Sequence, residues 1–153
     1  MNSIKYYEKS LSIFPGNSDA SYKVGLIYSM IGKPDQSIKY YRQSLESTPG
    51  QLYALNNLGS LYASRKQYDS AKYYFTNSIH IDSTNEMTLT NLVVVHCLLK
   101  EYDEAINFGN KAIALQYRNG KIYSLLSQSW LAKGNIDMAN KYAELEKQLL
   151  PVK

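Results

Sequence analysis

Apolar residues in the middle of this chain follow two runs of helical spacing, separated by a short polar turn. Spacing of three and four residues places the members of each run on one face of a helix, so the pattern predicts a pair of amphipathic helices. Gly59 stands inside the first run, although glycine costs a helix interior about 1 kcal/mol relative to alanine. We interpret it as a point where a second helix approaches closely. The two runs are Leu55, Leu58, Leu61, Tyr62 and Ala71, Phe75, Ser78, Ile79.

This helix pair recurs along the chain at a constant spacing. Residues 22–30 read YKVGLIYSM and align with residues 56–64, which read NNLGSLYAS. The same shift carries SIKYYEKSL at residues 3–11 onto SIKYYRQSL at residues 37–45, with two differences in nine positions. Glycine and proline, which interrupt helices, stand between the runs. A helix pair of this size cannot bury its apolar faces alone, so successive copies must stack on one another.

The repeating unit resembles the tetratricopeptide repeat family, a helix-turn-helix of about 34 residues. The segment LNNLGSLYASRKQYDSAKYYFTNSI has the family's leucine-glycine, tyrosine, alanine and phenylalanine marks at the family's spacing. The resemblance implies an all-α fold, a right-handed α-solenoid of about four and a half repeats. We expect one continuous domain, in which residues 1–16 form the second helix of an incomplete repeat and residues 17–153 hold four tandem repeats. Their expected bounds are 18–51, 52–85, 86–119 and 120–153.

Four positions depart from the family pattern. Val93 and Ser127 occupy the glycine position, His96 replaces a tyrosine, and Gly109 replaces a large aromatic residue. These departures predict looser packing around the fourth unit, without a change of fold.

The two ends of the repeat array differ from its middle. A first helix for the initial unit would precede residue 1, so we expect the chain to be an excised piece of a longer repeat protein. The face of the initial helix that contains Tyr7 would then be an exposed apolar patch. This predicts a weak homodimer through the N-terminal half-repeat. At the other end, Asn140 and Lys147 replace apolar residues of earlier repeats, which predicts a final helix that faces water.

Composition limits the class of protein. The chain has 153 residues, of which 44% are hydrophobic and 20% charged, values typical of a globular domain. Its formal net charge of +4 comes without a block of like charges. The longest apolar run, LVVVHCLL, has eight residues, whereas a membrane-spanning helix needs about 20. No signal-peptide pattern opens the chain. We therefore expect no membrane contact and a cytoplasmic location.

Residues that carry chemistry are sparse. The chain has no glycine-rich phosphate loop, metal-spaced His/Cys group or nucleophile elbow. His96 and Cys97 are adjacent, so on a helix they point about 100° apart and cannot act as a pair. We therefore predict no catalytic residue, no cofactor and no metal. An aromatic stripe also recurs once in each repeat, and we interpret it as packing and not as a platform for nucleic-acid bases. It consists of Tyr6, Tyr40, Tyr74, Phe108 and Tyr142.

The resemblance implies a ligand site, because first helices line the concave groove of a tetratricopeptide solenoid. Asn57 and Asn91 occupy equivalent inward positions of successive repeats. An asparagine amide offers both a donor and an acceptor, so a ladder of asparagines can bind the backbone of an extended peptide. Similar ladders occur in the repeats of the O-linked N-acetylglucosamine transferase family. The predicted groove residues are Tyr22, Lys23, Leu26, Tyr53, Asn56, Asn57, Ser60, Met87, Asn91, Val94, Lys121 and Gln128.

The sequence therefore favours a non-catalytic protein–protein interaction scaffold that binds a peptide or protein segment in the groove. A sensory or regulatory input segment of a larger signalling or transcription-regulatory protein is the alternative. Nucleic-acid binding is not favoured, because only Lys23 and Lys121 supply inward cations and Asp19 opposes them. The family's clamp for a C-terminal carboxylate is also not favoured, since only Asn91 and Lys121 match its pattern.

Overall fold

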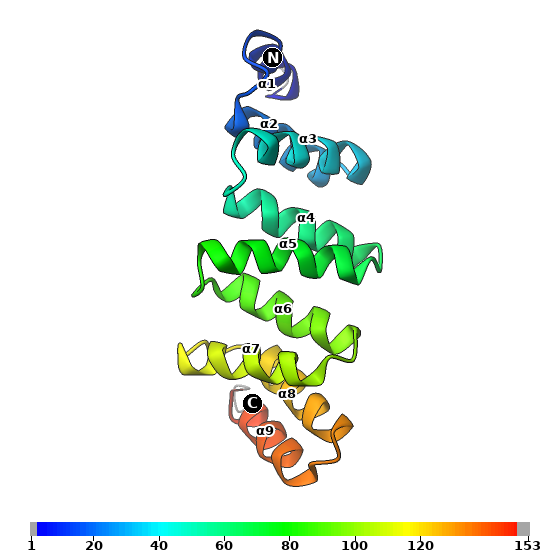
Figure 1. Ribbon diagram of the computed structural model, residues 1–153, viewed down its shortest axis with the longest axis vertical. Coiled ribbons are helices and arrows are strands. Elements are labelled where there is room, and N and C mark those ends of the chain that lie inside the picture. Colours follow the sequence, from blue (N-terminus) through cyan, green and yellow to red (C-terminus); the bar gives the residue numbers. More distant parts are fainter. Residues whose placement is uncertain (1–2, 150–153) are drawn as a thin grey trace. The chain divides into compact units, whose positions relative to one another are not determined.

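The computed structural model describes residues 3–149, which form nine α-helices and no strand (Figure 1). This confirms the all-α prediction. The first helices of the four pairs begin at positions 18, 52, 86 and 120, and the second helices at 34, 68, 102 and 136, so both series keep the repeat spacing. The helices are α1 Ser3–Ile13, α2 Ser18–Met30, α3 Pro34–Ser47, α4 Leu52–Ser64, α5 Tyr68–Ile81, α6 Glu86–Leu98, α7 Tyr102–Ala114, α8 Gly120–Ala132 and α9 Ile136–Leu149.

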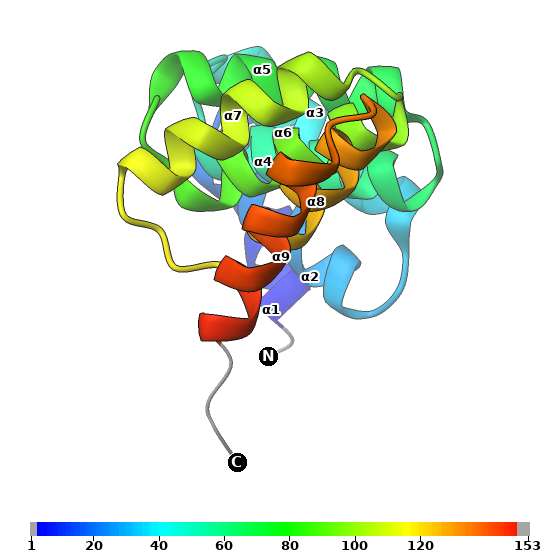
Figure 2. The ribbon, with the colours of Figure 1, turned by 90° about the horizontal axis from the view of Figure 1, so that it is seen from below.

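Contacts divide the chain into two compact units, Met1–Ile81 and Asp82–Lys153, called unit 1 and unit 2 below. In unit 1, α2 packs on α3 and α4 packs on α5, while α1 contacts α2 and α3 contacts α4. In unit 2, α6 pairs with α7 and α8 pairs with α9, and α8 also contacts both α6 and α7. The last pair, α8 and α9, lies side by side in both Figure 1 and Figure 2. One continuous domain of four repeats stays a prediction.

Asparagine side chains define the starts of three first helices. The Oδ1 atoms of Asn17, Asn85 and Asn119 accept hydrogen bonds from backbone N–H groups in the first turns of α2, α6 and α8. Such caps satisfy donors that have no partner within the helix. The equivalent residue before α4 is Gln51, whose longer side chain makes no cap hydrogen bond.

The turn inside each helix pair requires a left-handed residue. Gly32 and Gly134 have φ values of 71° and 77° at this position. Lys66 and Lys100 occupy the same position of the middle pairs, with φ values of 59° and 62°. Glycine adopts this conformation freely, whereas a residue with a Cβ is strained in it.

Close helix contact explains two glycines of unit 1, Gly25 and Gly59. A Cβ atom added to Gly25 would lie 2.7 Å from a ring carbon of Tyr41, and one added to Gly59 would lie 2.6 Å from a ring carbon of Phe75. Both distances are shorter than any normal carbon contact. The close approach predicted at Gly59 is therefore confirmed.

Unit 2 also contains a close helix contact, with the small residue on a second helix. Val93 replaces the glycine of the first helix and is fully buried. Gly109 replaces the aromatic residue of the second helix, and a Cβ added there would lie 2.7 Å from a methyl carbon of Leu126. The prediction of looser packing is wrong at Gly109, because Leu126 of α8 packs directly against this glycine.

The recurrent aromatic stripe packs against rings of the first helices. Tyr28 stacks on Tyr40 with ring centroids 5.5 Å apart, and Tyr62 stacks on Tyr74 at 5.4 Å. His96 takes the same place on Phe108 at 5.3 Å. The interpretation of the stripe as packing is confirmed for these three pairs.

The end of unit 1 at α1 is only partly covered. Leu11 forms a small core with Ala20 and Val24 of α2, and Tyr7 packs against it. Tyr7 is thus half-buried, whereas Tyr6 and Phe14 are exposed. The exposed apolar residues at this end are therefore Tyr6, Ile13 and Phe14, and Tyr7 is not among them. In α9, Asn140 and Lys147 are exposed, as the sequence predicted.

Candidate functional site

The first helices of unit 1 carry an aromatic surface with one cation. The rings of Tyr22 in α2 and Tyr53 in α4 have centroids 6.2 Å apart, and Tyr53 is 62% exposed. The ammonium of Lys23 lies 5.7 Å from the centroid of the Tyr22 ring. Two aromatic side chains and a lysine can contact the apolar and acidic parts of a peptide at once.

The two asparagines of α4 have different roles. The Nδ2 atom of Asn57 donates to the hydroxyl of Tyr41 at 3.1 Å, and the Asn57 side chain is half-buried. Asn56 is only 1% exposed, so its amide presents no surface to a ligand in this structure. The equivalent residue of the previous repeat is Tyr22, whose longer side chain reaches the surface while the short Asn56 side chain does not. Asn56 is thus a core residue here.

The remaining predicted residues of unit 1 flank this surface. Ser60 is exposed on α4, and Leu26 is half-buried on α2. No hydrogen bond joins them within the described part of the chain. They add accessible surface without fixing a specific geometry.

A hollow of about 410 Å³ lies on α6 of unit 2. It is lined by Glu86, Met87, Thr90, Asn91 and Asn119. Met87 is 47% exposed, which gives the hollow an apolar wall. The amide of Asn91 makes no hydrogen bond within residues 3–149, so its donor and acceptor are free for a ligand. The structure thus brings two predicted groove residues, Met87 and Asn91, into one hollow.

Asn119 also lines this hollow, although it is not among the predicted groove residues. It precedes α8 as a cap residue, and its Nδ2 atom reaches back to the hydroxyl of Thr90 at 3.4 Å. The repeat pattern could have indicated this. First helices that follow one another begin at the same end of their pairs, so the residue before α8 lies near the start of α6. The polar wall of the hollow therefore comes from α6 and from the loop before α8.

Three predicted residues of unit 2 lie outside the hollow. Val94 is half-buried on α6, and both Lys121 and Gln128 are exposed on α8. Lys121 lies two residues after Asn119 and donates its backbone N–H to the Asn119 side chain at 3.1 Å.

Residues that suggested chemistry serve the fold. The Nδ1 atom of His96 lies 2.6 Å from a carboxylate oxygen of Glu101, while the sulfur of Cys97 contacts the hydroxyl of Ser129 at 3.2 Å. Burial raises the pKa of the Cys97 thiol, which disfavours the reactive thiolate. The adjacent His96 and Cys97 thus have separate partners. Within residues 3–149, no cluster of three or more His, Cys, Asp or Glu could hold a metal, and none of the helices has the length and apolar character of a membrane span.

Comparison with known proteins identifies the repeats. Models of the tetratricopeptide repeat match residues 18–51 and 51–81. A crystal structure of MamA is 23% identical to this chain, with a TM-score of 0.88 over 95% of this chain and 85% of that chain. MamA 41-end from Desulfovibrio magneticus RS-1 is 15% identical, with a TM-score of 0.85 over 95% of this chain and 82% of that chain.

At these identities the likeness to MamA shows the fold alone. No curated protein matches this chain in sequence. The two repeat matches fall on α2 to α5, and the same spacing of the helices continues through α9. Residues 18–81 thus match tetratricopeptide repeats, and the chain has an all-α solenoid fold similar to that of MamA; both findings support a scaffold role in protein–protein interaction.

Proposed function

We propose that the first helices of this protein bind an extended peptide or protein segment without catalysing a reaction. The observation that supports this most strongly is the hollow on α6. It combines an exposed methionine with an asparagine amide that has no partner among residues 3–149. An extended peptide offers one donor and one acceptor per residue, so an amide at this place can bind its backbone whatever its sequence.

The hollow suits an apolar side chain flanked by peptide groups. Met87 is flexible and polarisable, and such residues adapt to differently shaped ligands. Asn119 is held in place by its hydrogen bonds to Thr90 and to the backbone of Lys121. A side chain fixed in this way loses little conformational freedom when a ligand binds.

Unit 1 offers a complementary surface on its own first helices. Tyr53 and Lys23 are exposed there, and tyrosine supplies a large contact area at a low entropic cost. Asn57 uses one amide hydrogen for Tyr41, which leaves its carbonyl and its second N–H for a ligand. The cytoplasmic location stays a prediction.

A peptide array followed by calorimetry tests this function. An array of mixed-sequence decapeptides would select a binder, which would then be titrated into the wild-type chain and into Asn57→Ala with Asn91→Ala. Each lost hydrogen bond contributes about 0.5–1.5 kcal/mol, so the double variant is expected to bind about tenfold more weakly. Asn107→Ala is the matched control, because it removes an exposed amide from the second helix α7. Equal affinity of the double variant and the control would rule out the amide ladder.

A further inference from the structure

Two residues of unit 1 break the repeat pattern in a way that packing does not explain. Tyr73 stands at a position where the other repeats have Lys5, Lys39, Asn107 and Lys141. Tyr73 is 63% exposed, so no core contact requires an aromatic ring there. Arg42 is likewise the one cation in a series whose other members are Glu8, Thr76, Asn110 and Glu144.

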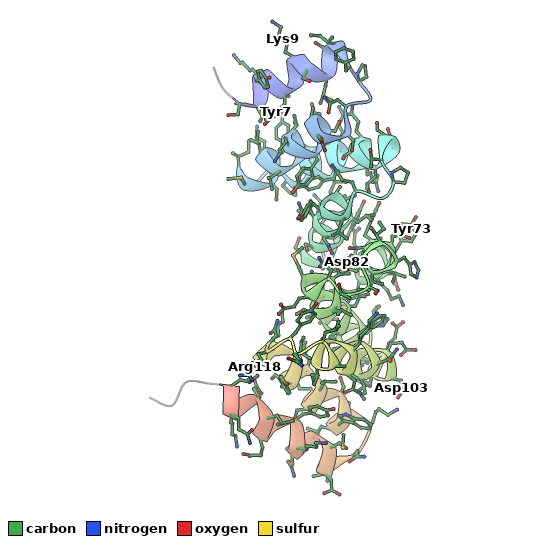
Figure 3. All side chains as sticks on the ribbon, turned by 90° about the vertical axis from the view of Figure 1, so that its left-hand side faces the viewer. Tyr7, Lys9, Tyr73, Asp82, Asp103 and Arg118 are labelled. Atoms are coloured by element: carbon green, nitrogen blue, oxygen red, sulfur yellow. The ribbon has the colours of Figure 1, made fainter. Side chains whose placement is uncertain are left out.

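These two exceptions meet on one surface, between the second helices α3 and α5. A hollow of about 690 Å³ and a second of about 410 Å³ lie there, and Arg42, Tyr73 and Tyr74 line both. The ring of Tyr73 packs edge-on against Tyr74, with centroids 5.2 Å apart. Figure 3 shows Tyr73 at the surface of unit 1. The two hollows thus adjoin at a pair of tyrosines.

The larger hollow has an apolar interior. The lining includes Leu55, which is buried, and Ile81, which is half-exposed. The corresponding residues of the previous repeat are the polar Ser21 and Ser47. The change to leucine and isoleucine at these two places gives this hollow a surface that favours an apolar side chain.

A hydrogen bond between a second helix and the preceding loop, present in the previous repeat, is absent among the described residues that line the larger hollow. In that repeat the Nε2 atom of Gln43 donates to the backbone carbonyl of Pro15 at 3.2 Å. Asn77 is the equivalent residue in the larger hollow. It is one methylene shorter and makes no hydrogen bond within residues 3–149. The hollow therefore stays open between α5 and the loop before α4.

Charge indicates what the hollow binds. The Arg42 guanidinium donates to the hydroxyl of Tyr62 and lies 5.8 Å from the centroid of that ring. These partners are neutral, and no carboxylate pairs with Arg42 in the described part of the chain. Glu46 also lines the larger hollow, one turn further along α3. A ligand carboxylate is therefore favoured beside Arg42, where a guanidinium can hold it with two hydrogen bonds.

We propose that the α3–α5 hollow binds a segment of a partner protein that inserts one bulky apolar side chain over Leu55 and directs a neighbouring carboxylate to Arg42. Tyrosine and arginine dominate the binding energy of many protein interfaces, which agrees with the two residues that break the repeat. The net charge of +4 also favours an acidic partner. This site lies mainly on the second helices α3 and α5, with the buried Leu55 of α4 at its base, and it shares no residue with the surface proposed for the first helices.

A designed peptide array provides the probe. Capped hexapeptides would each contain one leucine, isoleucine or phenylalanine beside a glutamate, and matched peptides would have glutamine for glutamate or serine for the apolar residue. The best binder would be titrated into wild type, Tyr73→Lys, Arg42→Gln and the control Lys141→Ala. Lysine occurs at the Tyr73 position in three other repeats, so Tyr73→Lys is expected to fold, and circular dichroism checks this.

The expected result is binding that weakens at least tenfold in Tyr73→Lys and in Arg42→Gln and stays unchanged in Lys141→Ala. The glutamine and serine peptides are expected to lose a similar factor. Three results would overturn the proposal. No array peptide binds, or both variants bind the peptide as tightly as wild type does. In the third, Tyr73→Lys leaves peptide binding unchanged and abolishes self-association of the chain. The first-helix variants at Asn57 and Asn91 report on the other surface, so failure of one proposal is distinguishable from failure of the other.

Discussion

At the scale of single residues, unit 1 divides the space inside each helix pair between a glycine and a ring. Gly59 in α4 leaves room for Phe75 in α5, and Gly25 does the same for Tyr41. In unit 2 the small residue is Gly109, on the second helix, and Leu126 supplies the bulk. The small residue at the close contact thus lies on a first helix in unit 1 and on a second helix in unit 2.

Gly59→Ala is therefore expected to destabilise the protein by about 1–3 kcal/mol, since a methyl group would have to displace the Phe75 ring. Gly120→Ala is the matched control, because an added Cβ there meets nothing within 4 Å. Urea unfolding followed by circular dichroism measures both. Equal midpoints for the two variants would show that the contact at Gly59 is not close.

At the left-handed turns, unlike at Gly59, a substitution is expected to raise the stability of the protein. Lys66 has a positive φ that its side chain disfavours, so Lys66→Gly is expected to stabilise the protein by about 0.5–1 kcal/mol after the greater freedom of glycine in the unfolded chain is counted. Lys39→Gly, in the middle of α3, makes the same change where φ is helical and is expected to destabilise by about 1 kcal/mol. Thermal unfolding of both variants decides the matter, and a lower melting temperature for Lys66→Gly would contradict the strain.

At the scale of elements, second helices hold the aromatic rings of the following helix pair through polar contacts that repeat along the chain. A carboxylate oxygen of Glu8 accepts from the hydroxyls of Tyr28 and Tyr40, at 3.2 and 3.4 Å. Arg42 makes the equivalent contact with Tyr62 by donating to it. The tyrosine hydroxyl thus donates to Glu8 in one repeat and accepts from Arg42 in the next, and a hydroxyl can do either.

The Glu8 contact predicts a loss of stability at alkaline pH. Burial, followed by the Glu8 carboxylate, raises the pKa of Tyr28 and of Tyr40 above the ordinary value of about 10. The folded state then holds protons that the unfolded state releases, so this stabilisation is complete below pH of about 10 and is lost as pH rises through the raised pKa values. Glu8→Gln removes the charge and should flatten the decline.

Urea unfolding of wild type and Glu8→Gln between pH 8 and pH 11 is the measurement. Other tyrosines and the lysines titrate in both proteins, so the difference between the two curves isolates Glu8. Parallel curves above pH 10 would contradict the contribution of Glu8.

The helices of this protein were predictable from periodicity, while features that depend on a facing element were not. The spacing of the repeats located the starts of α2, α4, α6 and α8. The close contact of Gly109 with Leu126 was not predictable, because the two residues lie on different helices and neither position alone indicates its neighbour. The turns at Lys66 and Lys100 were missed because lysine gives no turn signal.

The candidate site was predictable only in part, for the same reason. Met87 and Asn91 were expected at the surface of a first helix and line the hollow on α6. Asn56 was expected there too, but its short side chain is buried. The hollow between α3 and α5 combines residues from two second helices, a loop and the first helix α4, and no single repeat displays that combination.

At the scale of the whole molecule, the exposed apolar residues at α1 support the expectation of a weak dimer. Tyr6, Ile13 and Phe14 are all exposed at this end of unit 1, and a patch of this kind favours self-association through an isologous contact. Sedimentation velocity over a hundredfold range of concentration is expected to show a shift toward a dimer. Phe14→Ser is expected to weaken the shift, and a monomer at every concentration would contradict the prediction.

The central claim, that first helices bind an extended peptide, is tested most directly by mapping the bound peptide on the full chain. Amide chemical shifts would be recorded by NMR during titration with the decapeptide selected by the array. The account predicts that the largest changes occur at Met87, Asn91 and Asn119. Changes confined to the second helices, or saturable binding that leaves these three residues unperturbed, would contradict it.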